Sequence, residues 1–172
     1  MTAAELAAEL AKDAGFQEQA ARRMREIDER AALWRAAEAP ILADLEAAGV
    51  VVESVLDLVN TDEPYPNALP ILIAHFEAGA YPDRVLEGVG RALAVQPSVA
   101  FWERLVAVFR SSQSAGQVEG AAVALAACAT AAQLDDLIDL LSLEETGATR
   151  VYFLRPIWRL GGHRGREIIE QL

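Results

Sequence analysis

From residue 40 onward, hydrophobic residues recur every three or four positions in short runs that Pro and Gly interrupt. Residues 67–78, for example, form a short amphipathic run that carries Leu69, Ile71, Leu72, Ile73 and Phe76 and stops at Gly79. No stretch alternates apolar and polar residues with a period of two, so we predict no strands. The pattern predicts an all-α protein with helices over residues 40–48, 51–59, 67–78, 82–95, 97–111, 118–129, 133–141 and 149–160, and a further helix from residue 164. We expect Pro156 to kink the helix over 149–160, and Gly161-Gly162 to end it.

Residues 1–39 are instead rich in Ala, Glu and Arg, and contain no Pro. Their apolar residues form a seam with the spacing 4, 3, 4, 3, made of Ala20, Met24, Ile27, Ala31 and Trp34. This spacing places all five on one face of a helix. The seam either packs on its own domain or pairs in a homodimer through residues 17–38. Because it is short and includes two Ala, we favour packing on its own domain.

Three windows of the chain resemble one another, over residues 67–94, 100–127 and 135–161. Each contains an apolar helix, a short turn and a second helix, and residues 40–59 form a shorter pair of the same kind. Helical pairs that repeat at a fixed period of this size are typical of α-solenoids, in which neighbouring pairs stack. We therefore predict an N-terminal helical segment over 1–39 and a solenoid of about four helical pairs over 40–172.

The last repeat carries a resemblance to a known family. It reads Val151-Tyr-Phe-Leu-Arg-Pro-Ile-Trp-Arg-Leu-Gly-Gly and continues as Arg164-Gly-Arg-Glu-Ile-Ile. With its closing Leu160-Gly161 pair, the chain resembles HEAT and armadillo repeats of the short bacterial kind over residues 40–172. Tyr152 and Phe153 stand where the family usually has Val-Arg. The resemblance implies a right-handed α-α superhelix of HEAT-like hairpins, here with an N-terminal helical extension, whose second helices line a concave face.

The net charge and the cysteine content indicate which partners and which cellular compartment to expect. The formal net charge of −11 repels nucleic acid and anionic membranes at long range. A single cysteine, Cys128, rules out an intramolecular disulfide, which suits a reducing compartment, and its apolar surroundings predict a buried small hydrophobe. Residues 1–6 lack the features of a signal peptide, and the apolar run 121–132 is too short to span a bilayer. We expect a cytoplasmic protein without membrane contact.

Catalytic and metal-binding patterns are missing from the sequence. His75 and His163 have no ligand partner at metal-binding spacing, and we expect His75 to be structural. Asp135, Asp136 and Asp139 cluster at a predicted helix start, where the helix dipole favours carboxylates. We therefore expect no enzyme activity, no cofactor and no metal. Gly88-Val-Gly90 lies inside a predicted helix and indicates close helix packing.

The distribution of charge along the chain indicates a candidate binding surface. Residues 147–166 contain no Asp or Glu but five arginines, among which Arg155 and Arg159 share a helix face. Along the predicted second helices the charge changes from acidic, at Glu53, Asp57 and Glu87, to basic at the C-terminal end. The candidate partner-binding residues are Arg150, Arg155, Arg159, Arg91 and Glu87. Alternatively, the arginines pair with acidic neighbours of the previous repeat or complement a helix C-terminus.

The sequence thus predicts a non-catalytic interaction module or scaffold that binds a protein or peptide, of acidic character, on its concave face. One alternative is a nucleic-acid-binding protein of the HEAT-like DNA glycosylase type, which the net charge opposes. The other is a structural homo-oligomer organised by residues 17–38.

Overall fold

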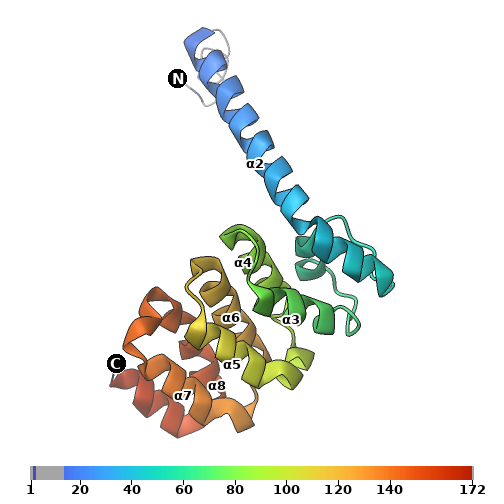
Figure 1. Cartoon of the computed structure of the whole chain (residues 1–172). Coiled ribbons are helices and arrows are strands. Elements are labelled where there is room, and N and C mark those ends of the chain that lie inside the picture. The colour runs from blue at the N-terminus through green and yellow to red at the C-terminus, as the bar shows by residue number, and fades with distance from the viewer. Residues whose placement is uncertain (1, 3–13, 172) are drawn as a thin grey trace. The chain divides into compact units, whose positions relative to one another are not determined.

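A computed structural model describes residue 2 and residues 14–171 of the chain. These residues form helices and no strands, so the all-α prediction is confirmed for them. The α-helices are α2 (Ala14–Ala47), α3 (Leu69–Ala78), α4 (Asp83–Ala92), α5 (Trp102–Ser111), α6 (Ala115–Cys128), α7 (Leu134–Ser142) and α8 (Val151–Glu170) (Figure 1). Four short 3-10 helices join them, η1 (Val55–Val59), η2 (Gln96–Phe101), η3 (Ala131–Gln133) and η4 (Glu144–Arg150).

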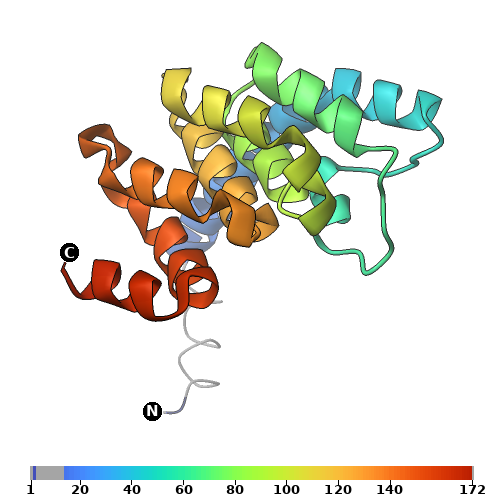
Figure 2. The ribbon, with the colours of Figure 1, turned by 90° about the horizontal axis from the view of Figure 1, so that it is seen from below.

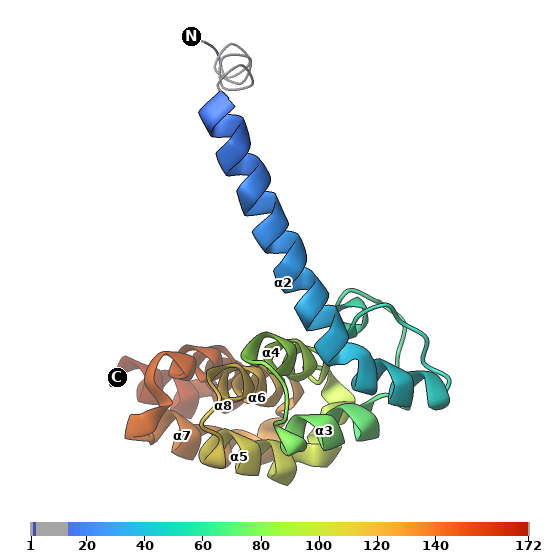
Figure 3. The ribbon, with the colours of Figure 1, turned by 45° about the horizontal axis from the view of Figure 1, so that its top comes forward.

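The chain divides into two compact units, residues 1–36 and residues 37–172. In the second unit, consecutive helices form three hairpins, α3 with α4, α5 with α6, and α7 with α8. The first helices of the hairpins form one layer and the second helices form another, as Figures 2 and 3 show. Within the layer of second helices, α6 contacts both α4 and α8. Each of the three repeat windows predicted from the sequence overlaps one of these hairpins. The window 67–94 contains α3 and α4 in full, whereas α6 ends at Cys128, α7 begins at Leu134 and α8 extends to Glu170.

The core of this unit lies along the apolar faces of the hairpins. In α4, the buried residues Val85, Leu86, Val89 and Ala92 follow the helical spacing of three and four. The largest fully buried side chains are Phe76, Phe153, Ile41, Leu45, Leu72, Ile73, Leu86, Leu93, Leu105, Leu125, Leu137 and Leu140. They come from every hairpin and from the end of α2, so the repeats share one continuous core.

Two predicted boundaries near the start of this unit are wrong. No helix begins at Pro40, because α2 continues through it to Ala47. A proline inside a helix costs about 3 kcal/mol, and burial of Ile41 and Leu45 just beyond it offsets that cost. The predicted helix over 51–59 is reduced to the short η1. Three consecutive valines before it, at 50–52, disfavour helix because their branched side chains crowd the preceding turn.

Glycine ends the helices at two places where the backbone turns left-handed. Gly79 closes α3 with φ 63°. Gly162, with φ 55° and ψ −123°, interrupts α8 and confirms the predicted stop at Gly161-Gly162. The break comes at this glycine and not at Pro156, which lies within the helical part. Helical structure resumes after it, and Gly165 packs directly on the Ile157 carbonyl, where a side chain has no room.

Among the described residues, no single helix is both long enough and apolar enough to cross a membrane. One pair, α4 with residues 96–111, reaches the required length and composition only when the two are taken together, and it is bent by 112°.

Candidate functional site

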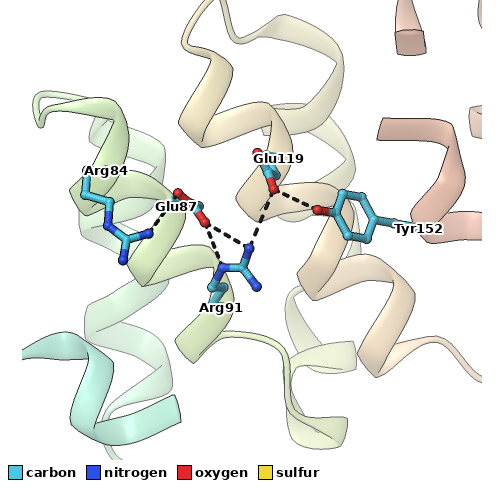
Figure 4. Close-up of polar contacts among 5 residues, drawn as sticks. All are labelled: Arg84, Glu87, Arg91, Glu119 and Tyr152. Atoms are coloured by element: carbon cyan, nitrogen blue, oxygen red, sulfur yellow. Dashed lines mark hydrogen bonds and ion pairs between the residues drawn. The ribbon is translucent and has the colours of Figure 1, made fainter. Parts of the chain in front are cut away.

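The layer of second helices carries a network of five polar side chains, shown in Figure 4. On α4, Glu87 accepts hydrogen bonds from Arg84, at 3.1 Å, and from Arg91, at 2.9 Å. Arg91 also approaches Glu119 of α6, with Nη2 and Oε1 3.6 Å apart. Tyr152 of α8 donates a hydrogen bond of 2.7 Å to the same Glu119 oxygen. The network therefore connects the second helices of three successive hairpins.

The repeat explains why these residues meet. Glu87, Glu119 and Tyr152 are separated by 32 and 33 residues, so they occupy equivalent positions of successive second helices. Stacking the hairpins in register brings equivalent positions alongside one another. Other polar contacts follow the same period. Trp102 donates to Asp136, 34 residues later, and Ser114 donates to Asp83, 31 residues earlier.

Hydrogen bonds within the network shift the pKa values of its members. Burial acts to raise the pKa of Glu87, but hydrogen bonds from Arg91 and Arg84 outweigh it and lower that pKa overall. The hydrogen bond from Arg91 to Glu87 raises the pKa of Arg91. The hydrogen bond to Glu119 raises the pKa of Tyr152, because it stabilises the neutral phenol. Arg91 and Glu87, both predicted to bind a partner, are thus paired with each other on α4, and Arg91 also approaches Glu119 of α6.

This arrangement predicts an acid-dependent loss of stability. A carboxyl whose pKa is lowered by folding stabilises the protein above its ordinary pKa of about 4.5, and this contribution is lost as the pH falls through the folded value. We expect Glu87→Gln to reduce the free energy of unfolding by about 1 kcal/mol at neutral pH, and to reduce it progressively less as the pH falls below the ordinary carboxyl pKa of about 4.5. Urea unfolding at a series of pH values measures the loss of stability at neutral pH and its dependence on pH.

The matched control for Glu87→Gln is Glu63→Gln, in the loop before α3. Glu63 is exposed and has no ion pair in the part of the chain that the structure describes. Its replacement should leave the pH profile of stability unchanged. A Glu87→Gln profile that runs parallel to that of the wild type would contradict a stabilising role for the ionised carboxylate.

The other predicted binding residues have a different environment. Arg150, Arg155 and Arg159 are exposed, and the side chain of none of them forms an ion pair or hydrogen bond with a described residue. Pairing with an acidic neighbour does occur at Arg164, whose Nη1 lies 2.7 Å from Oδ1 of Asp135. This ion pair lies within the α7–α8 hairpin, so the structure shows no pairing of these arginines with an acidic residue of the previous repeat among the described residues.

Two exposed apolar side chains lie among the unpaired arginines. Trp158 is 56% exposed and Val151 is 59% exposed, whereas the neighbouring Phe153 is fully buried. Residues 151, 155 and 158 share one face of α8, and residue 159 lies one turn beyond 155. We call the set Arg150, Val151, Arg155, Trp158 and Arg159 the α8 patch. The sequence identified its cations, but it did not show which aromatic residue is exposed.

The remaining candidate groups have structural partners. His75 lies 2.6 Å from the Tyr81 hydroxyl and 2.9 Å from the Asp44 carboxylate, which confirms the structural role predicted for it. Cys128 is buried, also as predicted. Within the described residues, no three His, Cys, Asp or Glu side chains are grouped so that they could hold a metal ion. No protein-family model, curated protein or solved structure matches this chain.

Proposed function

We propose that this protein is a non-catalytic interaction module that binds an acidic segment of a partner protein on the α8 patch. The observation that carries the proposal is a group of three exposed arginines that have no ionic partner among the described residues, beside an exposed tryptophan, in a chain with a net charge of −11. Carboxylates are abundant in this chain, and Arg84, Arg91, Arg104 and Arg164 all pair with one. Other arginines, such as Arg25 and Arg110, also lack an ion pair among the described residues. The patch differs from them because residues 147–166 contain no Asp or Glu, so positive charge is concentrated there in an otherwise acidic chain.

The chemistry of the patch defines its partner. Arg155 and Arg159 stand one helical turn apart, where like charges repel each other unless an anion lies between or above them. The arginine guanidinium presents a planar fork of donors that matches a carboxylate. Trp158 supplies the kind of large apolar side chain that most often anchors an interface. A segment that combines acidic residues with an apolar side chain satisfies both features.

The proposal extends to the fold. We infer a HEAT-like, right-handed α-solenoid, supported by three consecutive hairpins whose second helices form one layer. In such repeats the second helices line the concave, partner-binding face, and the α8 patch lies on a second helix. The proposal includes a cytoplasmic location and the absence of catalysis. The α4–α6–α8 network then stiffens the surface next to the patch, which reduces the entropy lost on binding.

We expect the wild-type protein to bind a fluorescent peptide that alternates Glu and Leu, measured by anisotropy, and to bind it more weakly as the salt concentration rises. Arg155→Glu/Arg159→Glu should weaken binding about tenfold, because each exposed ion pair contributes up to about 1 kcal/mol. Trp158→Ala should weaken binding at all salt concentrations, since its contribution is apolar.

The matched control is Arg25→Glu/Arg110→Glu, which changes the charge equally at two exposed arginines outside the patch. Equal loss of binding in both double variants would show a general charge effect and contradict the proposal. A second probe, duplex DNA, tests the nucleic-acid alternative, and tighter binding of DNA than of the acidic peptide would favour that alternative. A pull-down from the source lysate, compared between wild type and Arg155→Glu/Arg159→Glu by mass spectrometry, then identifies the natural partner.

A further inference from the structure

The first part of α2, residues 14–36, exposes an apolar seam. Met24 is 56% exposed, Ile27 is 46% exposed and Trp34 is 37% exposed, although large apolar side chains are usually covered. They lie at the spacing of the seam, with Ala20 and Ala31 between them. No residue from 15 to 36 is buried. Residues 14–36 by themselves therefore leave these three side chains of the seam exposed. The expectation that the seam packs on its own domain stays a prediction.

An exposed apolar face on a helix favours a partner. In proteins most helical stability comes from packing of such a face and not from intrinsic propensity. The alternating spacing of three and four residues is the pattern by which two helices pack along a shared seam. The same spacing continues to Ile41 and Leu45, which are fully buried in the unit of residues 37–172. The seam is covered there and exposed in residues 14–36.

Charge indicates what covers it. Residues 14–36 contain five arginines and four acidic residues, so the segment is close to neutral in a chain whose net charge is −11. Two copies can therefore approach through this segment with little repulsion, which their acidic remaining surfaces do not allow. Arg23 and Asp28 flank the seam five residues apart. In a parallel pair of helices, this spacing places Arg23 of one copy opposite Asp28 of the other, twice by symmetry.

We propose that residues 14–36 form a parallel two-stranded coiled coil with the same segment of a second copy. The inference is independent of the α8 patch and of the function proposed for it. Two features make the dimer weak. Ala occupies two of the five seam positions and contributes little apolar area. Arg30 and Arg35, the next pair at the flanking positions, repel each other across the interface. The expected dissociation constant is about micromolar.

Sedimentation equilibrium of the full chain tests the proposal. We expect a concentration-dependent dimer that Ile27→Asp converts to a monomer, with at least a tenfold weaker association. The matched control is Leu33→Asp, because Leu33 is 69% exposed on the same helix but lies off the seam. This variant should still dimerise. Arg30→Glu should tighten the dimer severalfold, since it replaces the repulsion from Arg35 of the second copy by attraction.

Each other outcome overturns the proposal. A wild type that stays monomeric at about 100-fold the expected dissociation constant excludes the dimer. Equal effects of Ile27→Asp and Leu33→Asp exclude the seam as the interface. A monomeric wild type that is destabilised by Ile27→Asp alone, measured by thermal unfolding, places the seam within its own chain. Weaker dimerisation of Arg30→Glu excludes the parallel arrangement. Peptide binding to the α8 patch is measured separately, so failure of either proposal is recognised by itself.

Discussion

Replacing Gly90 by Ala is expected to lower the free energy of unfolding by about 3 kcal/mol or more. Gly90 of α4 faces Gly120 of α6 at a point where the two second helices approach closely. A Cβ atom added at Gly90 would overlap the Cα atom of Gly120 and lie 2.5 Å from its carbonyl carbon. Because both are backbone atoms, no side chain can rotate away, and the two helices must separate.

The same helix provides a matched control in Gly88. A Cβ atom there would lie 3.5 Å from the Leu56 side chain, which is an ordinary contact. Ala favours helix over Gly by about 1 kcal/mol, so Gly88→Ala should leave stability unchanged or raise it slightly. Thermal and urea unfolding of both variants distinguish the two glycines. A Gly90→Ala protein as stable as the wild type would contradict the observed helix spacing.

The sequence predicted this packing only in part. The Gly88-Val-Gly90 motif indicated close packing of a helix, and the structure confirms it at Gly90. Two glycines in one helix do not show which of them faces a neighbour, and they do not identify that neighbour. The answer depends on how α4 is rotated against α6, which is set by burial of Val85, Leu86 and Val89.

The helices were predictable where apolar spacing and turn residues agree. In α3, for example, four buried residues follow the helical period and Gly79 marks the end. The errors came where two local preferences compete. Pro40 opposes helix continuation, but burial of Ile41 and Leu45 outweighs it. In residues 51–59, the apolar spacing suggested a helix, but branched residues and the cap at Ser54 leave only η1.

For the candidate site, the sequence identified the charges and missed the contacts. It singled out Arg155 and Arg159 by the local excess of positive charge, but Glu87 and Arg91 were assigned to binding although they pair with each other. The repeat period would have found part of the network. Glu87, Glu119 and Tyr152 stand one repeat apart, so stacking brings them together, and the same rule relates Trp102 to Asp136. Pairing between repeats should therefore be considered before charged residues are assigned to a partner.

Cys128 should react with thiol reagents at least a thousandfold more slowly in the native protein than in denaturant. It is fully buried near the end of α6, and burial raises the pKa of its thiol from 9.0 to about 12. The reactive species is the thiolate, whose population at neutral pH falls tenfold for each unit of pKa. Because the chain has no other cysteine, the reaction of a chromogenic disulfide reports this position alone.

We expect the thiol of Cys128 to react only when the packing around α6 opens. Because α6 contacts α4, α5 and α8, exposing Cys128 requires these helices to separate, and the native rate then follows the population of opened molecules. We expect Gly90→Ala to accelerate labelling about a hundredfold, in proportion to its loss of stability, and Gly88→Ala to leave it unchanged. If labelling proceeds through opened molecules, its rate rises with pH up to the ordinary thiol pKa of 9.0. If the reagent attacks the buried thiol directly, the rate rises up to the pKa of that thiol, about 12. Rapid labelling of the native protein would show that the end of α6 opens on its own, so that the core formed by α4, α6 and α8 does not unfold as one cooperative unit.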